Sequence, residues 1–200
     1  MLEGSPAYPA TFSFDPPEHV ANWRPLLQWL LVFPHYVVLY ALNIASQIVG
    51  LVSWFAIVFT GKMPEGLATF QVMYIRYAAR TYSYLGFMRE EYPPFSFATT
   101  AADPGDDPRV RVDVQPALTD RNRLTVAFRF ILAIPQAVAL MFVGLALYFV
   151  YLIAFFVVLF TGHWTDGLRD FVIGVFRWYI RFLAYVLLLT DRYPPFAFDD

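Results

Sequence analysis

The chain has 200 residues, of which 58% are hydrophobic and 15% are charged, whereas about 25% of the residues of an ordinary soluble domain are charged. Its formal net charge is −2 and its arginines are scattered, which argues against a nucleic-acid-binding face. The chain has no cysteine, so disulfides, thiolate nucleophiles and cysteine-ligated metals are excluded.

Short segments of alternating polarity open each half of the chain. Residues 11–14 (TFSF) and 109–114 (RVRVDV) alternate in the manner of half-buried strands. The YPPFSF segment at 92–97 and the YPPFAF segment at 193–198 are also expected to be extended, because proline cannot continue a helix. We expect these pieces to pair as a small sheet outside the hydrocarbon, because strand edges cannot lie in lipid.

A long apolar run follows each alternating segment. Residues 25–61 and 130–162 contain no Asp, Glu, Lys or Arg, and each run exceeds the roughly 20 apolar residues that span a bilayer. A single helix over 36 residues would extend about 54 Å, so we expect Pro34 and Pro135 to break the runs. The predicted spans are residues 35–60 and 136–161, and the runs indicate an integral membrane protein.

The apolar runs end in two similar stretches, FTGKMPEGL at 59–67 and FTGHWTDGL at 160–168. Glycine takes the left-handed conformation that ends a helix, and an acidic residue in the first turn of the next helix complements its dipole. The pattern is therefore typical of the turn of a helical hairpin. The residues assigned to the two turns are Gly61, Glu65, Gly66, Gly162, Asp166 and Gly167.

The helix after each turn carries a pair of arginines, Arg76 with Arg80 and Arg177 with Arg181. Residues four apart share one helix face, and a charge within a membrane needs a partner, a wet cavity or a route to the surface. Three interpretations stay open. The arginines pack against carbonyls and tyrosine hydroxyls around a wet centre, they lie at headgroup level in interfacial helices, or they contact an anionic lipid or solute.

The same order of motifs recurs at an offset of 101 residues. Phe-Thr-Gly, Gly-Leu, the paired arginines and Pro-Pro-Phe appear in both halves, which predicts repeat units at residues 8–98 and 109–200 and a linker at 99–108. In these motifs the chain resembles the bacterial membrane-protein family of unknown function catalogued as domain of unknown function 4389, present as two tandem copies. The resemblance implies a membrane location and supplies no catalytic residue.

Other candidate chemistry is sparse. No zinc-protease, P-loop or dinucleotide motif occurs, so we expect no enzymatic activity, cofactor or metal. Asp103, Asp106 and Asp107 lack the spacing of a known calcium loop, and we expect a solvated turn there. Asn43 and Gln47 are polar amides within the first apolar run, where such side chains usually join helices.

These patterns predict an all-α membrane protein with two tandem helical hairpins, about four transmembrane helices, and short β segments on the cytoplasmic face. Lys62 and Arg169 are the only basic residues near the hairpin tips, so the positive-inside rule places both termini of this multi-pass protein on the cytoplasmic side of the cell (inner) membrane. In the alternative topology, the apolar runs are re-entrant and the arginine helices lie in the membrane plane.

For function, we expect a non-enzymatic membrane module that interacts with lipid or supports a complex. Its partners would be membrane lipids, including anionic ones, a membrane protein or a second copy, but no nucleic acid. The alternative is a small transporter or channel in which the four arginines line an anion path at the repeat interface.

Overall fold

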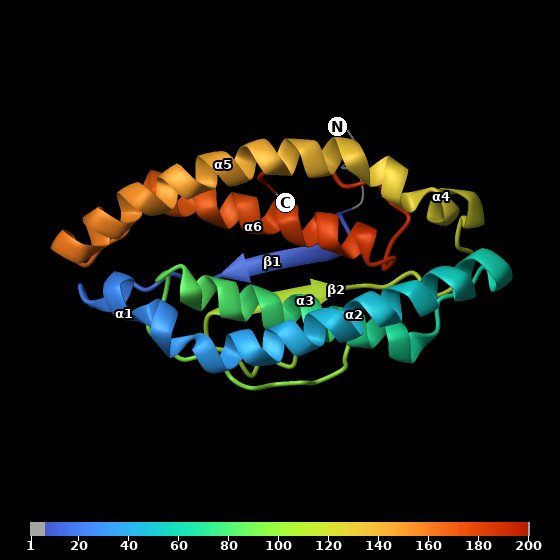
Figure 1. Cartoon of the computed structure of the whole chain (residues 1–200), viewed down its shortest axis with the longest axis horizontal. Coiled ribbons are helices and arrows are strands. Elements are labelled where there is room, and N and C mark those ends of the chain that lie inside the picture. Colours follow the sequence, from blue (N-terminus) through green and yellow to red (C-terminus); the bar gives the residue numbers. More distant parts are fainter. Residues whose placement is uncertain (1–6, 200) are drawn as a thin grey trace, which may run out of the picture.

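The computed structural model describes residues 7–199, which form an elongated molecule with four long helices running along its length (Figure 1). The described part of the chain is mostly helical, with one small sheet. The elements, in chain order, are β1 (Ala10–Phe14), α1 (Arg24–Leu31), α2 (Phe33–Thr60), α3 (Glu65–Leu85), β2 (Val110–Val114), α4 (Arg123–Ala127), α5 (Arg129–Thr161) and α6 (Asp166–Val186).

The two apolar runs are broken at different places. In the first half the break falls between α1 and α2, with Pro34 in the first turn of α2, as predicted. In the second half it falls at Phe128, where φ is −101° and ψ is 17°, and Pro135 lies inside α5. The predicted break at Pro135 is therefore wrong. A proline this near the start of a helix removes one backbone hydrogen bond, which the rest of the helix tolerates.

Both hairpin turns are confirmed. Gly61 and Gly162 end α2 and α5 in the left-handed conformation, with φ of 73° and 72°. Glu65 and Asp166 are the first residues of α3 and α6, where a carboxylate meets the positive end of the helix dipole. The local sequence therefore determines where each helix ends and where the next begins.

Strands β1 and β2 form an antiparallel pair in which Phe12 lies opposite Val112. Their inner face is buried and apolar, whereas Thr11, Ser13 and Arg111 on the outer face are exposed. The two alternating segments were correctly predicted as strands. The two Pro-Pro-Phe segments are irregular and form no strand in the described part of the chain, so their predicted place in the sheet is wrong.

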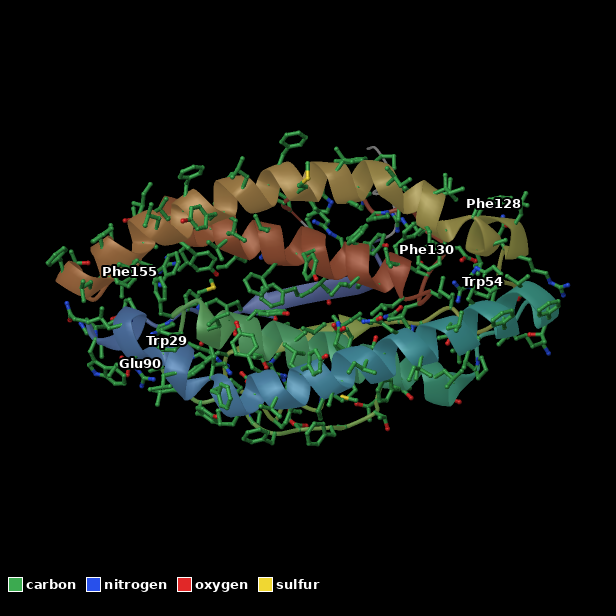
Figure 2. All side chains as sticks on the ribbon, in the orientation of Figure 1. Trp29, Trp54, Glu90, Phe128, Phe130 and Phe155 are labelled. Atoms are coloured by element: carbon green, nitrogen blue, oxygen red, sulfur yellow. The ribbon has the colours of Figure 1, made fainter. Side chains whose placement is uncertain are left out.

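The two halves exchange elements across a pseudo-two-fold axis. Strand β1 of the first half packs on α6 of the second, and β2 packs on α3. Helices α2 and α5 run in opposite directions along the molecule (Figure 1). The short helices also cross over, since α1 contacts α5 and α4 contacts α2. Figure 2 shows Trp29 and Phe155 at one end of the molecule and Trp54 and Phe128 at the other.

The long helices fall into two classes. Helices α3 and α6 are largely buried between the sheet and the outer helices, whereas α2 and α5 are largely exposed. Among residues 7–199, α2 and α5 are the two helices long and apolar enough to cross a membrane. Four transmembrane helices are not supported, because α3 and α6 carry arginines and bury them against protein groups rather than presenting an apolar surface to lipid.

Candidate membrane interface

The outer helices expose large apolar side chains along their whole length. Tyr40 and Phe59 on α2 and Phe130 and Phe160 on α5 each leave more than 70% of their surface exposed. Only 17% of the most apolar window of α2, and 11% of that of α5, is buried inside the molecule. The core helix of a soluble protein would be mostly buried, and contiguous apolar patches of this kind mark membrane or protein contacts. Both helices therefore suggest association with a membrane.

Polar side chains join the outer helix α2 to the inner helix α3 in the first half. Asn43 of α2 donates from Nδ2 to the hydroxyl of Tyr74 of α3 at 2.7 Å, and Gln47 donates to Asn43. Ser46 donates to Oε1 of Gln71, whose Nε2 donates back to the Ser46 carbonyl at 2.8 Å. The prediction that amides in the first run join helices is confirmed for Asn43.

Arg76 of α3 reaches away from the outer helices into the sheet and the linker. Its Nε lies 3.1 Å from Oδ2 of Asp103, and both side chains are 97% or more buried. Its guanidinium also donates to the carbonyl of Val112 in β2 at 3.3 Å. Further carbonyl acceptors, at 3.2 to 3.3 Å, are those of Ala98, Thr100 and Ala101. Arg76 thus fastens both the linker and the strand to α3.

Arg80 lies one turn further along α3 and binds the same linker. Its Nη2 lies 3.0 Å from Oδ1 of Asp103, and its Nη1 lies 2.7 Å from Oδ1 of Asp106. Asp103 therefore sits between two buried guanidinium groups. The carboxylates of Asp103 and Asp106 together compensate the two positive charges where water is largely excluded.

The arginines of α6 lie beside the C-terminal segment. Arg181 is buried and donates to the carbonyls of Ala197 and Asp199, both at 2.6 Å. Its own backbone carbonyl accepts a hydrogen bond from the hydroxyl of Tyr8 at 3.3 Å. Arg177 is half-buried on the same helix. The structure thus places the two arginine pairs on separate helices, and Arg76, Arg80 and Arg181 each bind the segment that follows their own helix.

The Asp-rich linker was expected to be a solvated turn, and for Asp103 and Asp107 this is wrong. Asp107 and Arg89 are both fully buried, and Arg89 Nη1 lies 2.5 Å from Asp107 Oδ1. That oxygen also accepts the backbone amides of Arg109 and Val110 at 2.9 Å. The arginines of the inner helix have no acidic residue within the apolar runs, and this absence was the signal that could have directed attention to the nearest acidic cluster.

The second half has an ion-pair centre of its own at Asp191, whose arginine partners were not predicted from the sequence. Arg121 lies 2.8 Å and Arg129 lies 2.5 Å from its Oδ1. The guanidinium of Arg129 also lies over the ring of Tyr185, 3.9 Å from its centroid, a favourable cation–π contact. These contacts tie the start of α5 to the end of α6.

Both centres hold their carboxylates in the charged form. Burial by itself would raise the pKa of Asp107, but hydrogen bonds from Arg89 and from two backbone amides outweigh it and leave the pKa below its usual value. Burial opposes the charge on Asp191 in the same way, and its bonds with Arg121 and Asn122 again lower the pKa. At neutral pH both centres are therefore paired ions.

Each hairpin turn accepts a backbone hydrogen bond from the other half of the chain. The amide of Arg121 donates to the carbonyl of Gly61 at 3.1 Å, and the amide of Val20 donates to that of Gly162 at 2.8 Å. The remaining turn residues, Glu65, Gly66, Asp166 and Gly167, are exposed. The turns thus fasten the two halves together, which the local sequence did not reveal.

Comparison with known proteins agrees with this duplication. Residues 22–96 and residues 123–197 each match the family described as Domain of unknown function (DUF4389). Together the two matches cover more than half of the chain. The chain belongs to this family. Each DUF4389 match contains one outer helix, one inner helix and one Pro-Pro-Phe segment, whereas β1, β2 and the Asp-rich linker lie outside both matches.

The wider comparisons add no activity to the DUF4389 assignment. No curated protein matches the chain, and no solved structure does. The family assignment confirms the two tandem copies that the repeated motifs predicted.

Proposed function

We propose that this protein is a non-enzymatic membrane module that lies in one leaflet, with α2 and α5 in the apolar region and the sheet on the aqueous side. In that position it organises lipid or supports a partner in the membrane. The observation that carries the proposal is the separation of two surfaces: exposed apolar side chains on α2 and α5, and exposed polar side chains on the sheet.

The position of the sheet favours helices that lie in the membrane plane. Arg76, near the middle of α3, donates to Val112 in β2, and Phe12 of β1 stacks on Phe176 near the middle of α6 at 5.3 Å. If α3 and α6 crossed the bilayer, the exposed polar face of the sheet would lie at mid-depth. Hydrocarbon does not tolerate an open sheet edge, so the spanning arrangement carries a large cost.

The lengths of the outer helices support the same orientation. At 1.5 Å per residue, the 28 residues of α2 extend about 42 Å and the 33 residues of α5 about 50 Å. The hydrocarbon core is only about 30 Å thick. An in-plane helix has no such mismatch. The pseudo-two-fold axis then runs along the membrane normal, and both termini and both hairpin tips lie on the cytoplasmic side.

The buried arginines do not support the transporter alternative. Arg76, Arg80 and Arg181 bind carboxylates or carbonyls of the protein itself. Two cavities of the described chain, of about 540 and 180 Å³, are lined by apolar, tyrosine, glycine and asparagine residues and by none of these arginines. We therefore propose phospholipid as the partner of the outer helices, and a membrane protein or a second copy as the competing occupant of that surface.

Cysteine accessibility in intact cells tests the proposed orientation. Lys62 and His163 are exposed at the two hairpin tips, and the protein has no native cysteine. In the variants Lys62→Cys and His163→Cys, an impermeant thiol reagent should label the tips only after lysis. Labelling from outside would show that the hairpins span the membrane and would overturn the in-plane arrangement.

A matched variant on the sheet provides the reference. Ser13 is exposed on the polar face of β1, so Ser13→Cys should label after lysis at the same rate as the tip variants. Flotation of the purified protein with phosphatidylcholine vesicles tests membrane association separately. If the protein does not float with the vesicles, the proposal that it is a membrane module is wrong.

A further inference from the structure

A cavity of about 540 Å³ lies between α5, α6 and the C-terminal end of α3. Leu140, Gly144 and Leu147 line it from α5, and Val175 and Phe176 line it from α6. The remaining lining residues are apolar or tyrosine, apart from Gly86, and no charged side chain is among them. Pockets of a few hundred Å³ with apolar walls typically hold small organic ligands.

The corresponding place in the first half is filled. At the offset of 101 residues, Gly144 corresponds to Asn43 and Val175 corresponds to Tyr74. Asn43 and Tyr74 hydrogen-bond to each other at 2.7 Å, and the space beside them measures only about 180 Å³. Gly144 has only a hydrogen where Asn43 has an amide side chain, and Val175 has an isopropyl group where Tyr74 has a phenol. These smaller side chains leave the second half with the larger space. The cavity is therefore a property of one repeat and not of the shared fold.

The cavity is accessible from the surface of an exposed apolar helix. Gly144 is exposed, and a Cβ added there would meet no atom within 4 Å. Tyr82 and Tyr179 also line the cavity and are partly exposed, at 36% and 38%. Tyrosines with one apolar and one wet side favour the boundary between hydrocarbon and headgroups.

We propose that this cavity binds one hydrocarbon chain of a lipid. The proposal rests on the proposed function, because the chain would enter from the leaflet in which α5 lies. Apolar walls without charged groups do not hold water well, and smaller dry cavities already take up apolar molecules. The site has no counterpart of the same size in the first half, so the protein binds one chain in this manner per molecule.

Photolabelling of the full-length protein tests the proposal. The protein is placed in vesicles of phosphatidylcholine that carries a diazirine on one acyl chain, and labelled residues are located by fragment mass spectrometry. Phe176 is 9% exposed and Phe160 is 77% exposed. A chain in the cavity should label Val175 and Phe176, whereas bulk lipid should label Phe160.

Two glycine variants distinguish the cavity from the general surface. Gly144→Leu should fill the opening and lower labelling of Phe176 at least fivefold, with Phe160 unchanged. Gly66→Leu is the matched control, because Gly66 is also a helical glycine with nothing within 4 Å of an added Cβ and does not line the cavity. Circular dichroism and the melting temperature verify that both variants fold.

A second arm, with a diazirine-bearing free fatty acid, identifies the source of the chain. Labelling of Phe176 by either probe supports the site, and the stronger probe shows whether phospholipid or free fatty acid supplies the chain. Unlabelled Phe176 beside labelled Phe160, or equal labelling of Phe176 in Gly144→Leu, overturns the cavity proposal alone. An unlabelled Phe160 would instead contradict the membrane placement of α5.

Discussion

The two repeats place arginines at matching positions of their inner helices but use them to fasten different segments. In the first repeat, Arg76 and Arg80 meet the carboxylate of Asp103 from the linker. In the second, Arg181 meets backbone carbonyls of the C-terminal segment. Guanidinium donors accept either kind of oxygen. The arginines therefore serve the shared architecture by fastening to the inner helix the segment that follows it.

The interiors of the two helix pairs differ in a second way. The polar pair of Asn43 with Tyr74 joins α2 to α3, whereas the corresponding Gly144 and Val175 line a cavity between α5 and α6. Elsewhere a buried hydrogen bond from Trp178 to Gln136 joins α6 to α5. The hairpin turns, by contrast, are nearly the same in both repeats. Duplication has kept the turns, which hold the two halves together, and has let the helix interiors diverge.

The largest expected effect concerns the buried ion pair of the first repeat. Asp107→Ala leaves Arg89 as an uncompensated charge at a site that is fully buried. Breaking such a pair should lower the free energy of unfolding by about 3–5 kcal/mol. Asp106→Ala is the control within the same linker, because the Asp106 side chain is 32% exposed and should matter far less. Chemical unfolding in detergent measures both variants, and equal losses would contradict the special role of Asp107.

A smaller loss of stability is expected when Arg76 is replaced. If Arg76 serves only to hold the structure together, its loss should lower stability alone, whereas if it contacts lipid, its loss should weaken binding to acidic vesicles. Arg76→Gln removes hydrogen bonds to a carboxylate and to several carbonyls, and should lower the free energy of unfolding by about 2–3 kcal/mol. Binding to vesicles with acidic lipid should stay unchanged, because the Arg76 side chain is 97% buried inside the protein. The measurements are unfolding and vesicle sedimentation of the same variants.

The lysine variant and a surface variant sharpen this test. Arg76→Lys keeps the charge without the planar fork and should be less stable than the native protein. Arg169→Gln removes only an exposed pair with Asp166 near a hairpin tip, which is worth about 0–1 kcal/mol. A folded Arg76→Gln protein with weaker binding to acidic vesicles would instead show that the arginine contacts lipid.

Features set by a few neighbouring residues were predictable from the sequence. The cap glycines, the acidic residues that open the inner helices and the alternating strands all lie where their local patterns place them. The duplication was predictable because the motifs recur in order. In each case a short stretch of chain carries the whole physical reason.

Features that depend on distant partners were not predictable in this way. A fairly apolar helix that carries arginines has the same sequence pattern whether lipid or protein surrounds it. The sequences of α3 and α6 therefore suggested two further membrane spans. The exchange of β1 and β2 between the halves also leaves no local trace, because two similar units can each pair with their own strand or with the other's. The carboxylate partners were hidden for the same reason, since Asp107 lies 18 residues from Arg89.

The smallest expected effect comes from giving the second repeat the polar pair of the first. Gly144→Asn with Val175→Tyr places an amide and a phenol at positions that correspond to Asn43 and Tyr74, beside a cavity with room for both. If the pair forms, its hydrogen bond should add about 1 kcal/mol of coupling in a double-mutant cycle, because a net intramolecular hydrogen bond contributes about that much. The double variant should also lose photolabelling at Phe176, since the side chains fill the space. Melting temperatures in detergent of the two single variants and the double variant measure the coupling. Strictly additive effects would show that the helices of the second repeat lie too far apart to recreate the contact, and that the two repeats differ in backbone spacing as well as in side chains.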